Sequence, residues 1–381
     1  YTTVGEIVAW VIGWDMLLEM LMPGSVVSKY WGVYLNQFFE LIGWNINTNI
    51  AIGSFNFDLA PVIIVAFFTA LLVMGTKIGA RVDGALTILK IAIVVFIVVV
   101  GFFYIKAENF TPFIPPSEPA ASTDGSGVSA VMEQPLWQWA PGLAPSIYGV
   151  TGIISGAALV FFAFLGFDVV ATASEETITP KKNVPLGIGV GLGLIIVLYT
   201  LVAIVTTGMV SYKDLAKQSD PSLAVAFKMV GADWAAKIIS LGIVIGRATV
   251  VMVLLLGLTR VVFAMSRDGL LPRGLSHTGK HGTPVRLQII VGVVMALIAA
   301  CCNVGILSDM VNIGTLSAFT LVAISIPIMR KKRPDLERSF KIPGNPWVPI
   351  LIALANLWLM VNLRVLTWIR FVVWLIVGFA I

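Results

Sequence analysis

Several charged residues lie inside long apolar segments, where a charge is energetically costly. Asp15 and Glu19 are four residues apart in the first such segment, so both lie on one face of a helix. Lys90 and Arg247 lie in two later segments. A charge at the centre of a bilayer costs about 3 kcal/mol or more, so such residues pair with one another and mark ion or substrate pathways. These residue types predict ion handling within a membrane.

Depth along the expected helices predicts which charges meet. Arg247 precedes Arg260, at the expected membrane boundary, by 13 residues, which is roughly 20 Å at helical rise. Glu19 follows Gly5 by 14 residues, or roughly 21 Å. Because these depths agree, we predict that Arg247 forms an ion pair with Glu19 or Asp15.

Lys90 has two interpretations. It lies six residues after Gly84, roughly 9 Å into its segment, so its long side chain can extend to the membrane surface. Alternatively the amine is buried, and its desolvation favours the neutral form. The second interpretation predicts a group that gains and loses a proton during a transport cycle.

The segment Phe161-Phe-Ala-Phe-Leu-Gly-Phe-Asp168 carries an acid at mid-depth, two residues after a glycine. This pattern is poorly suited to an uninterrupted helix. A broken helix leaves backbone groups free, which membranes tolerate only where these groups face protein or a water-filled cavity. Such groups bind the ammonium and carboxylate of small substrates. The other interpretation is a continuous helix whose Asp168 faces a neighbouring helix.

The elements that position these residues are membrane-spanning helices. Hydrophobic residues make up 58% of the 381-residue chain and charged residues 12%, about half the charged share of a globular protein. Runs near 20 apolar residues are long enough to cross the hydrocarbon core. We expect ten spans in a single transmembrane domain: 5–27, 59–80, 84–105, 150–173, 184–211, 235–265, 285–303, 306–329, 346–363 and 366–381.

The net charge of +5 is explained by the arrangement of the loops rather than by a nucleic-acid site. Most Lys and Arg residues lie in loops after the even-numbered spans, including the basic cluster at 330–341. The loop 107–149 is almost free of them and reads as an irregular external loop. Because basic loops stay in the cytoplasm, we expect a multi-pass protein of the cell membrane whose first residues and basic cluster are cytoplasmic.

The sequence resembles the amino acid–polyamine–organocation superfamily, in particular its cationic amino acid transporter branch. The resemblance follows family order along nearly the whole chain. It rests on Val4-Gly5-Glu6 with Gly13-Trp14-Asp15 and Glu19, on Phe161 to Asp168 with Glu175-Glu176 and Pro180 to Pro185, on Gly257 to Arg260 with Ala264 to Pro272, and on Asn312 to Phe319.

The resemblance implies an all-α membrane protein with a LeuT-type fold of two five-helix inverted repeats, here lacking its first two helices. The first span then corresponds to the family's third helix and the span 150–173 to its sixth. Substrate would bind at that broken helix, under an aromatic gate at Phe162. The backbone and acid of the site would come from Phe162, Ala163, Phe164, Leu165 and Asp168. Lys90 would be the proton-coupling amine, facing the hydroxyl of Thr249.

Two positions depart from the family pattern. Arg247 stands where an uncharged side chain is expected, and Ala248 replaces a hydroxyl residue. Arg247 would repel a cationic substrate, so a neutral amino acid is as good an expectation as a cationic one. Asp15, Glu19 and Arg247 would then form a structural or regulatory charge cluster.

The sequence therefore predicts a secondary active transporter that imports L-amino acids with protons by alternating access. Its partners would be the amino acid, protons, membrane lipid and a possible small membrane protein, without nucleic acid. One alternative is an amino acid exchanger in which Lys90 is a structural cation. The other is a transport-dead membrane scaffold, since half of the family's substrate site lies in the helices that the resemblance finds absent.

An enzyme is not expected, and neither is a cofactor or a metal. His277 and His281 are four residues apart, but Gly279 lies between them and Gly282 and Pro284 follow. No cysteine or acid cluster completes a metal site there. We interpret this stretch as a solvated cytoplasmic loop.

Overall fold

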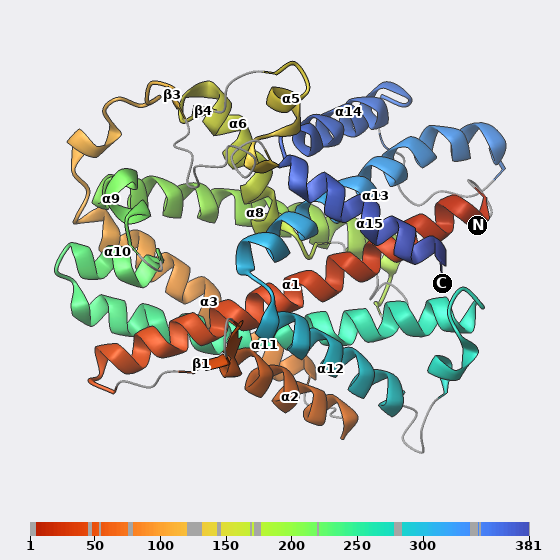
Figure 1. Cartoon of the computed structure of the whole chain (residues 1–381), viewed down its shortest axis with the longest axis horizontal. Helices are drawn as coiled ribbons and strands as arrows, with labels where there is room; N and C mark the ends of the chain where they lie inside the picture. The colour runs from red at the N-terminus through yellow and green to blue at the C-terminus, as the bar shows by residue number, and fades with distance from the viewer. Residues whose placement is uncertain are drawn as a thin grey trace.

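The computed structural model describes residues 5–44, 48–52, 55–74, 79–119, 132–142, 146–167, 170, 177–218, 221–277, 284–335, 342 and 344–380. Helices dominate these ranges, and both ends of the chain lie at the same end of the molecule (Figure 1).

The α-helices, with gaps in numbering as in Figure 1, are α1 (Glu6–Leu41), α2 (Leu59–Val73), α3 (Gly79–Phe102), α5 (Leu136–Trp139), α6 (Gly149–Val160), α8 (Pro180–Met209), α9 (Tyr212–Ala216), α10 (Leu223–Met229), α11 (Asp233–Arg267), α12 (Val285–Cys301), α13 (Val304–Lys332), α14 (Trp347–Val361) and α15 (Val365–Ala380). Short 3-10 helices are η1 (Ala107–Phe110), η2 (Phe161–Phe164) and η4 (Arg273–Ser276).

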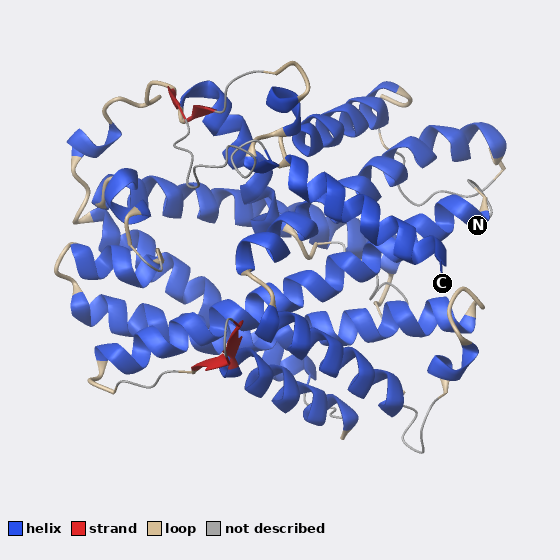
Figure 2. Cartoon of the chain, viewed as in Figure 1, coloured by secondary structure: helices blue, strands red, loops and turns tan. Residues whose placement is uncertain are grey.

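Within the described residues, strands form two small two-stranded antiparallel sheets, drawn red in Figure 2. β1 (Asn49–Ile52) pairs with β2 (Phe55–Asp58), and β3 (Glu118–Pro119) pairs with β4 (Ser146–Ile147). The first hairpin leads directly into α2, where the Asp58 carboxylate accepts the Ala60 N–H at 3.2 Å and so caps the helix. The second sheet belongs to the expected external loop, which therefore contains short ordered elements.

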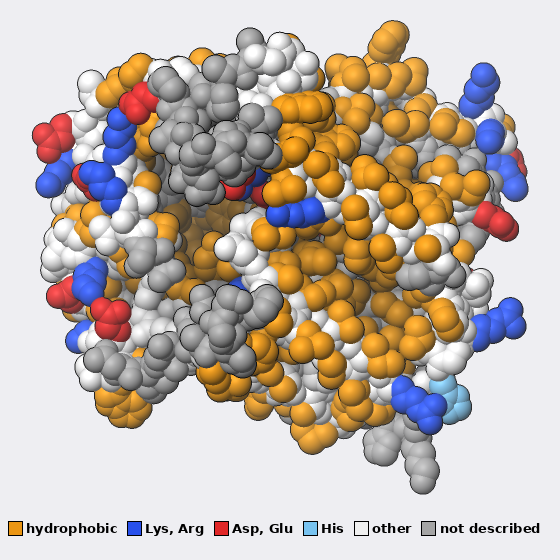
Figure 3. Space-filling view, in the orientation of Figure 1, with side chains coloured by type: hydrophobic (Ala, Val, Ile, Leu, Met, Phe, Trp, Pro, Cys, Tyr) orange, Lys and Arg blue, Asp and Glu red, His pale blue; other side chains and the backbone are white. Residues whose placement is uncertain are grey.

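The surface has the distribution expected of a membrane protein. In Figure 3 most charged side chains gather at two opposite ends, and a broad hydrophobic band separates them. Among the described residues, α1, α8, α11 and α13 are long and apolar enough to cross a membrane, and six shorter apolar helices accompany them. The chain is thus a multi-pass membrane protein, while the count of ten spans stays a prediction.

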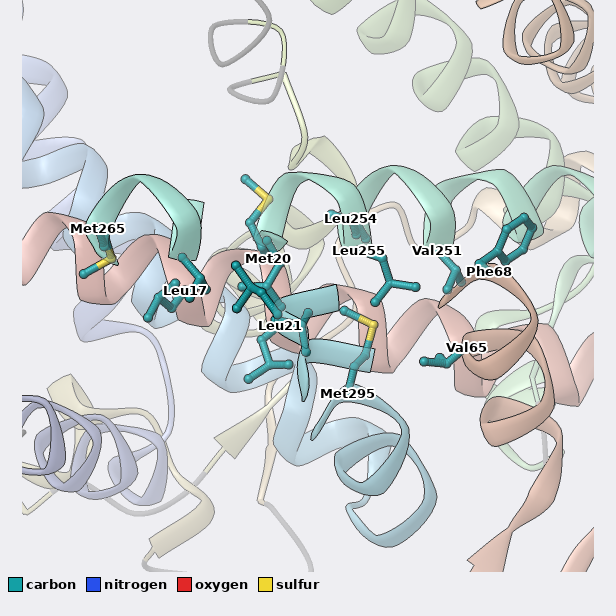
Figure 4. Close-up of a cluster of buried hydrophobic side chains, with 14 of the residues drawn as sticks. Leu17, Met20, Leu21, Val65, Phe68, Val251, Leu254, Leu255, Met265 and Met295 are labelled. Carbon is teal, nitrogen blue, oxygen red and sulfur yellow. The ribbon is translucent and has the colours of Figure 1, made fainter. Parts of the chain in front are cut away.

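The largest buried cluster joins α1, α2, α11 and α12 (Figure 4). Met20 of α1, Leu255 of α11 and Met295 of α12 are each at most 1% exposed. A polar contact adds to this packing, because the Lys29 amine donates to the Cys302 carbonyl at 2.6 Å. A cation at a helix C-terminus also interacts favourably with the helix dipole.

The first helix is longer than predicted. We expected it to end at residue 27, near Pro23 and Lys29, but α1 continues to Leu41. Its added turns pack: Tyr34 is 5% exposed and belongs to a second cluster with residues of α3 and α11. Burial of this face outweighs the backbone hydrogen bond that Pro23 removes.

Candidate functional site

The break in the span 150–173 is confirmed. The α-helix α6 ends at Val160, the chain tightens into η2, and Leu165 is extended with φ −68° and ψ 151°. Gly166 follows with φ +108°, a conformation that glycine adopts without steric cost. Ala163 and Gly166 are both exposed in the described structure. For Gly166, which has no side chain, this exposed surface is the backbone itself.

Two helices border the break. On the α13 side, the Phe319 ring centroid lies 6.3 Å from that of Phe161 and 5.3 Å from that of Phe167. On the α8 side, Phe164 and Tyr199 meet edge to face at 5.4 Å. The Asn312 side-chain amide of α13 donates to the Leu159 carbonyl at 3.3 Å. Aromatic contacts thus hold the break between α8 and α13.

The predicted substrate residues lie on this irregular segment. Phe162, Ala163 and Phe164 belong to η2, and Leu165 is its extended C-terminal neighbour. The Leu165 N–H donates to the Phe162 carbonyl at 3.3 Å, so this carbonyl already has a partner. Asp168 lies outside the described residues, and its predicted role stays a prediction.

Lys90 of α3 lies against α11. A Cβ atom added to Gly246 would come within 3.1 Å of the Lys90 Cγ and 3.6 Å of its Cε. The absence of a side chain at Gly246 therefore lets the lysine stem lie directly on α11. Thr249 is 5% exposed, and its hydroxyl donates to the Gly246 carbonyl at 2.9 Å. The amine and the hydroxyl predicted to act together are thus brought to the same part of α11.

Asp15 and Glu19 are buried in α1, at 0% and 4% exposure. Asp15 lies close enough to the Ser317 hydroxyl of α13 to interact with it. Neither Asp15 oxygen has a hydrogen bond of good geometry within the described part of the chain. Asp15 therefore belongs to the packed contact of α1 with α13, and Glu19 is buried one turn further along α1.

Arg247 does not join these acids, so the predicted ion pair is wrong. Its guanidinium lies 5.0 Å from the Tyr30 ring centroid and 5.1 Å from that of Tyr34. Tyr30 is eleven residues beyond Glu19 on the same helix, roughly 16 Å along its axis. The helices are antiparallel, with Met20 beside Gly257. This register places Arg247 opposite the C-terminal half of α1.

Two tyrosines contact the guanidinium, and our sequence reasoning missed them. The rings of Tyr30 and Tyr34, both on α1, face the cation. Aromatic faces stabilise cations within about 6 Å. Tyr30 and Tyr34 are four residues apart, so one helical face carries both rings. That spacing was a signal available in the sequence.

No metal centre forms within the searched ranges, where no three His, Cys, Asp or Glu side chains come together. His281 lies outside the described residues, and His277 is exposed.

Comparison with known proteins gives the family. The model of the amino acid permease family matches residues 2–381. A branched-chain amino acid permease of Bacillus subtilis (strain 168), BcaP, is 38% identical over 391 residues, covering 100% of this chain and 77% of the permease. A methylthioribose transporter of the same organism is also 38% identical, covering 99% of this chain and 76% of that transporter.

A plant relative is more distant. The mitochondrial cationic amino acid transporter 3 of Arabidopsis thaliana is 33% identical, covering 88% of this chain and 52% of that protein. The family model and these relatives indicate a membrane transporter rather than an enzyme. The chain belongs to the amino acid permease family.

Proposed function

We propose that this protein is a secondary active transporter that imports L-amino acids together with protons by alternating access. The observation that carries the proposal is the break after α6, with accessible backbone at Ala163 and Gly166. The amino acid substrates of related permeases support it. We further propose the LeuT-type arrangement of inverted repeats, in which a broken helix forms part of the site.

Substrate binding would use the irregular segment from Phe162 to Leu165. Backbone carbonyls left free at a broken helix accept from a substrate ammonium, and free N–H groups donate to a carboxylate. The half-buried Phe162 ring would cover the bound substrate. Asp168 would act beyond the break, as the family resemblance implies.

Proton coupling would reside in Lys90. Its stem lies on Gly246 of α11, whose carbonyl accepts from the Thr249 hydroxyl one turn further along. An amine in contact with water favours its charged form, and removal of that water favours its neutral form. Substrate and proton become coupled when both favour the same conformation of the protein.

The test uses Lys90→Met in the full-length protein, reconstituted in vesicles with an alkaline interior. One proton per substrate would support about tenfold accumulation per pH unit, since one unit is about 1.4 kcal/mol. We expect the variant to lose this accumulation and to keep substrate binding, measured separately by thermal shift. The control is Lys237→Met, an exposed lysine of α11.

Accumulation by Lys90→Met vesicles at the wild-type level would show that Lys90 is not the coupling group. Uptake that requires internal amino acid and ignores the pH gradient would replace symport with exchange. A wild-type protein that binds and moves no amino acid would overturn the transport function itself.

A further inference from the structure

The helix α13 contacts both sides of the break after α6. Before the break, the Asn312 side-chain amide donates to the Leu159 carbonyl at 3.3 Å. At the break, the Phe319 ring centroid lies 6.3 Å from that of Phe161, which opens η2, and 5.3 Å from that of Phe167, which follows the break. Asn312 and Phe319 are seven residues apart, so one face of α13 carries both contacts. This face therefore spans the segment proposed to bind substrate.

Asn312 bonds the chain where the regular helix ends. Leu159 precedes Val160, the last residue of α6, and its carbonyl also accepts a backbone N–H of the turn that ends the helix. A carbonyl oxygen has two lone pairs, so it can accept the Asn312 amide in addition. This hydrogen bond ties the last turn of α6 to α13. The residues of η2 and the extended Leu165 follow directly from that turn, so their orientation depends on it.

The amide of Asn312 costs stability at this position. Its side chain is 0% exposed, and its Oδ1 atom has no hydrogen-bond partner within the described part of the chain. A buried acceptor without a partner costs free energy. Leucine has a similar size and would bury no polar atom. Because packing alone favours an apolar residue here, the amide is better explained by what it does to the Leu159 carbonyl than by stability.

We propose that Asn312 is a positioning residue of the substrate site, which acts through the Leu159 carbonyl on the backbone of η2, while Phe319 fixes the other side of the same segment. This inference rests on the proposed function and adds α13 to the elements that determine substrate affinity. Loss of one hydrogen bond between neutral groups corresponds to about a fivefold change in an equilibrium constant. We expect a change of this size in substrate affinity, without a loss of stability.

The experiment measures KM and Vmax for uptake by the full-length protein in vesicles, and the melting temperature of the substrate-free protein. The probe is radiolabelled L-leucine, or the best substrate of a full panel of L-amino acids if leucine is not taken up. Asn312→Leu should raise KM about fivefold, with Vmax unchanged and the melting temperature not lowered. Asn312→Gln, which keeps the amide, should recover part of the affinity. Phe319→Leu should also raise KM, because it removes the ring that faces Phe161 and Phe167.

The matched control is Asn362→Leu, at the end of α14. Asn362 is 4% exposed, and its amide donates to the Trp358 carbonyl of α14 at 2.8 Å. Its Oδ1 atom, like that of Asn312, has no partner within the described ranges. The same chemical group is thus removed from a hydrogen bond that does not involve the break. This variant should keep the wild-type KM.

A wild-type KM in a folded Asn312→Leu protein would overturn the inference, whatever its melting temperature. An equal rise of KM in Asn362→Leu would also overturn it, because the effect would then not be specific to the break. Asn312→Ala gives the same readout should the leucine variant fail to fold. If the wild type takes up no L-amino acid of the panel, the proposed function fails instead. A raised KM in Asn312→Leu, with partial recovery in Asn312→Gln and the wild-type KM in Asn362→Leu, supports the proposal.

Discussion

The contact between Lys90 and Gly246 allows the position of the amine to be tested separately from its presence. A Cβ at Gly246 would lie 3.1 Å from the Lys90 Cγ, closer than the optimum of about 3.5–4.0 Å between carbon atoms. The flexible stem can shift by a few tenths of an ångström to relieve this contact. Replacing glycine by alanine within a helix also gains about 1 kcal/mol of helix propensity. We therefore expect the free energy of unfolding of Gly246→Ala to lie within about 1 kcal/mol of the wild-type value.

Gly246→Val should behave differently in transport. Its two additional methyl groups would occupy the space of the Lys90 stem and displace the amine from α11, at an overpacking cost of about 1–3 kcal/mol. We expect pH-driven uptake to fall toward the level of Lys90→Met, although the lysine is still present. Vesicle uptake with an alkaline interior and the melting temperature of each variant give the two readouts.

The matched control is Gly257→Ala, on the same helix, where the added Cβ would make an ordinary 3.4 Å contact with the Met20 sulfur. This variant should keep both stability and pH-driven uptake. If a folded Gly246→Val protein accumulated substrate to the wild-type level, the reasoning would be refuted, because Lys90 would then couple transport to protons without its contact with Gly246.

Two further predictions concern stability. Gly292→Ala should lower the free energy of unfolding by about 1–3 kcal/mol, because its Cβ would overlap the Thr69 side chain of α2, including Cγ2 at 2.8 Å. In a double-mutant cycle, Thr69→Ala should recover part of this loss, and additive losses would contradict the contact. Burial raises the pKa of the Asp58 carboxyl, so the folded protein holds this proton more tightly than the unfolded chain and loses stability as pH rises above about 4. Asp58→Asn can still cap α2 and should gain in melting temperature over the wild type from pH about 4 to about 7; a pH-independent difference would exclude this titration.

The sequence raised the helix break as one of two interpretations because the cause is local. A glycine and an acid in mid-span suit a regular apolar helix poorly, and the structure decides for the break, with Gly166 at φ +108°. The pairing of Lys90 with Thr249 came from the family resemblance and stays a prediction; the structure shows that the Lys90 stem lies against Gly246, which has no side chain.

The partner of Arg247 was mispredicted because it depends on the register between two distant helices. Counting residues from each membrane boundary assumed that Gly5 and Arg260 lie at the same depth, whereas Gly257 of α11 packs beside Met20 of α1. The register is set by packing contacts such as Gly24 of α1 with Leu254 of α11. Hydrophobic periodicity along one helix carries no information about which turn of a partner it meets.

The helix α8 is packed against the rest of the described structure mainly at one end. Its buried residues, Val205, Gly208 and Met209, all lie near its C-terminal end, and the Gly208 carbonyl accepts from the Lys106 N–H at 2.9 Å and from the Asn109 side chain at 2.7 Å. The helix is about 45 Å long, and a tilt of α8 would pivot about its packed C-terminal end. A rotation of about 5° there would move the far end by about 4 Å and Tyr199, a third of the way along, by about 1.3 Å. A displacement of that size is enough to loosen the contact between Tyr199 and Phe164. A small tilt at the C-terminal end of α8 would therefore change the packing of the break after α6.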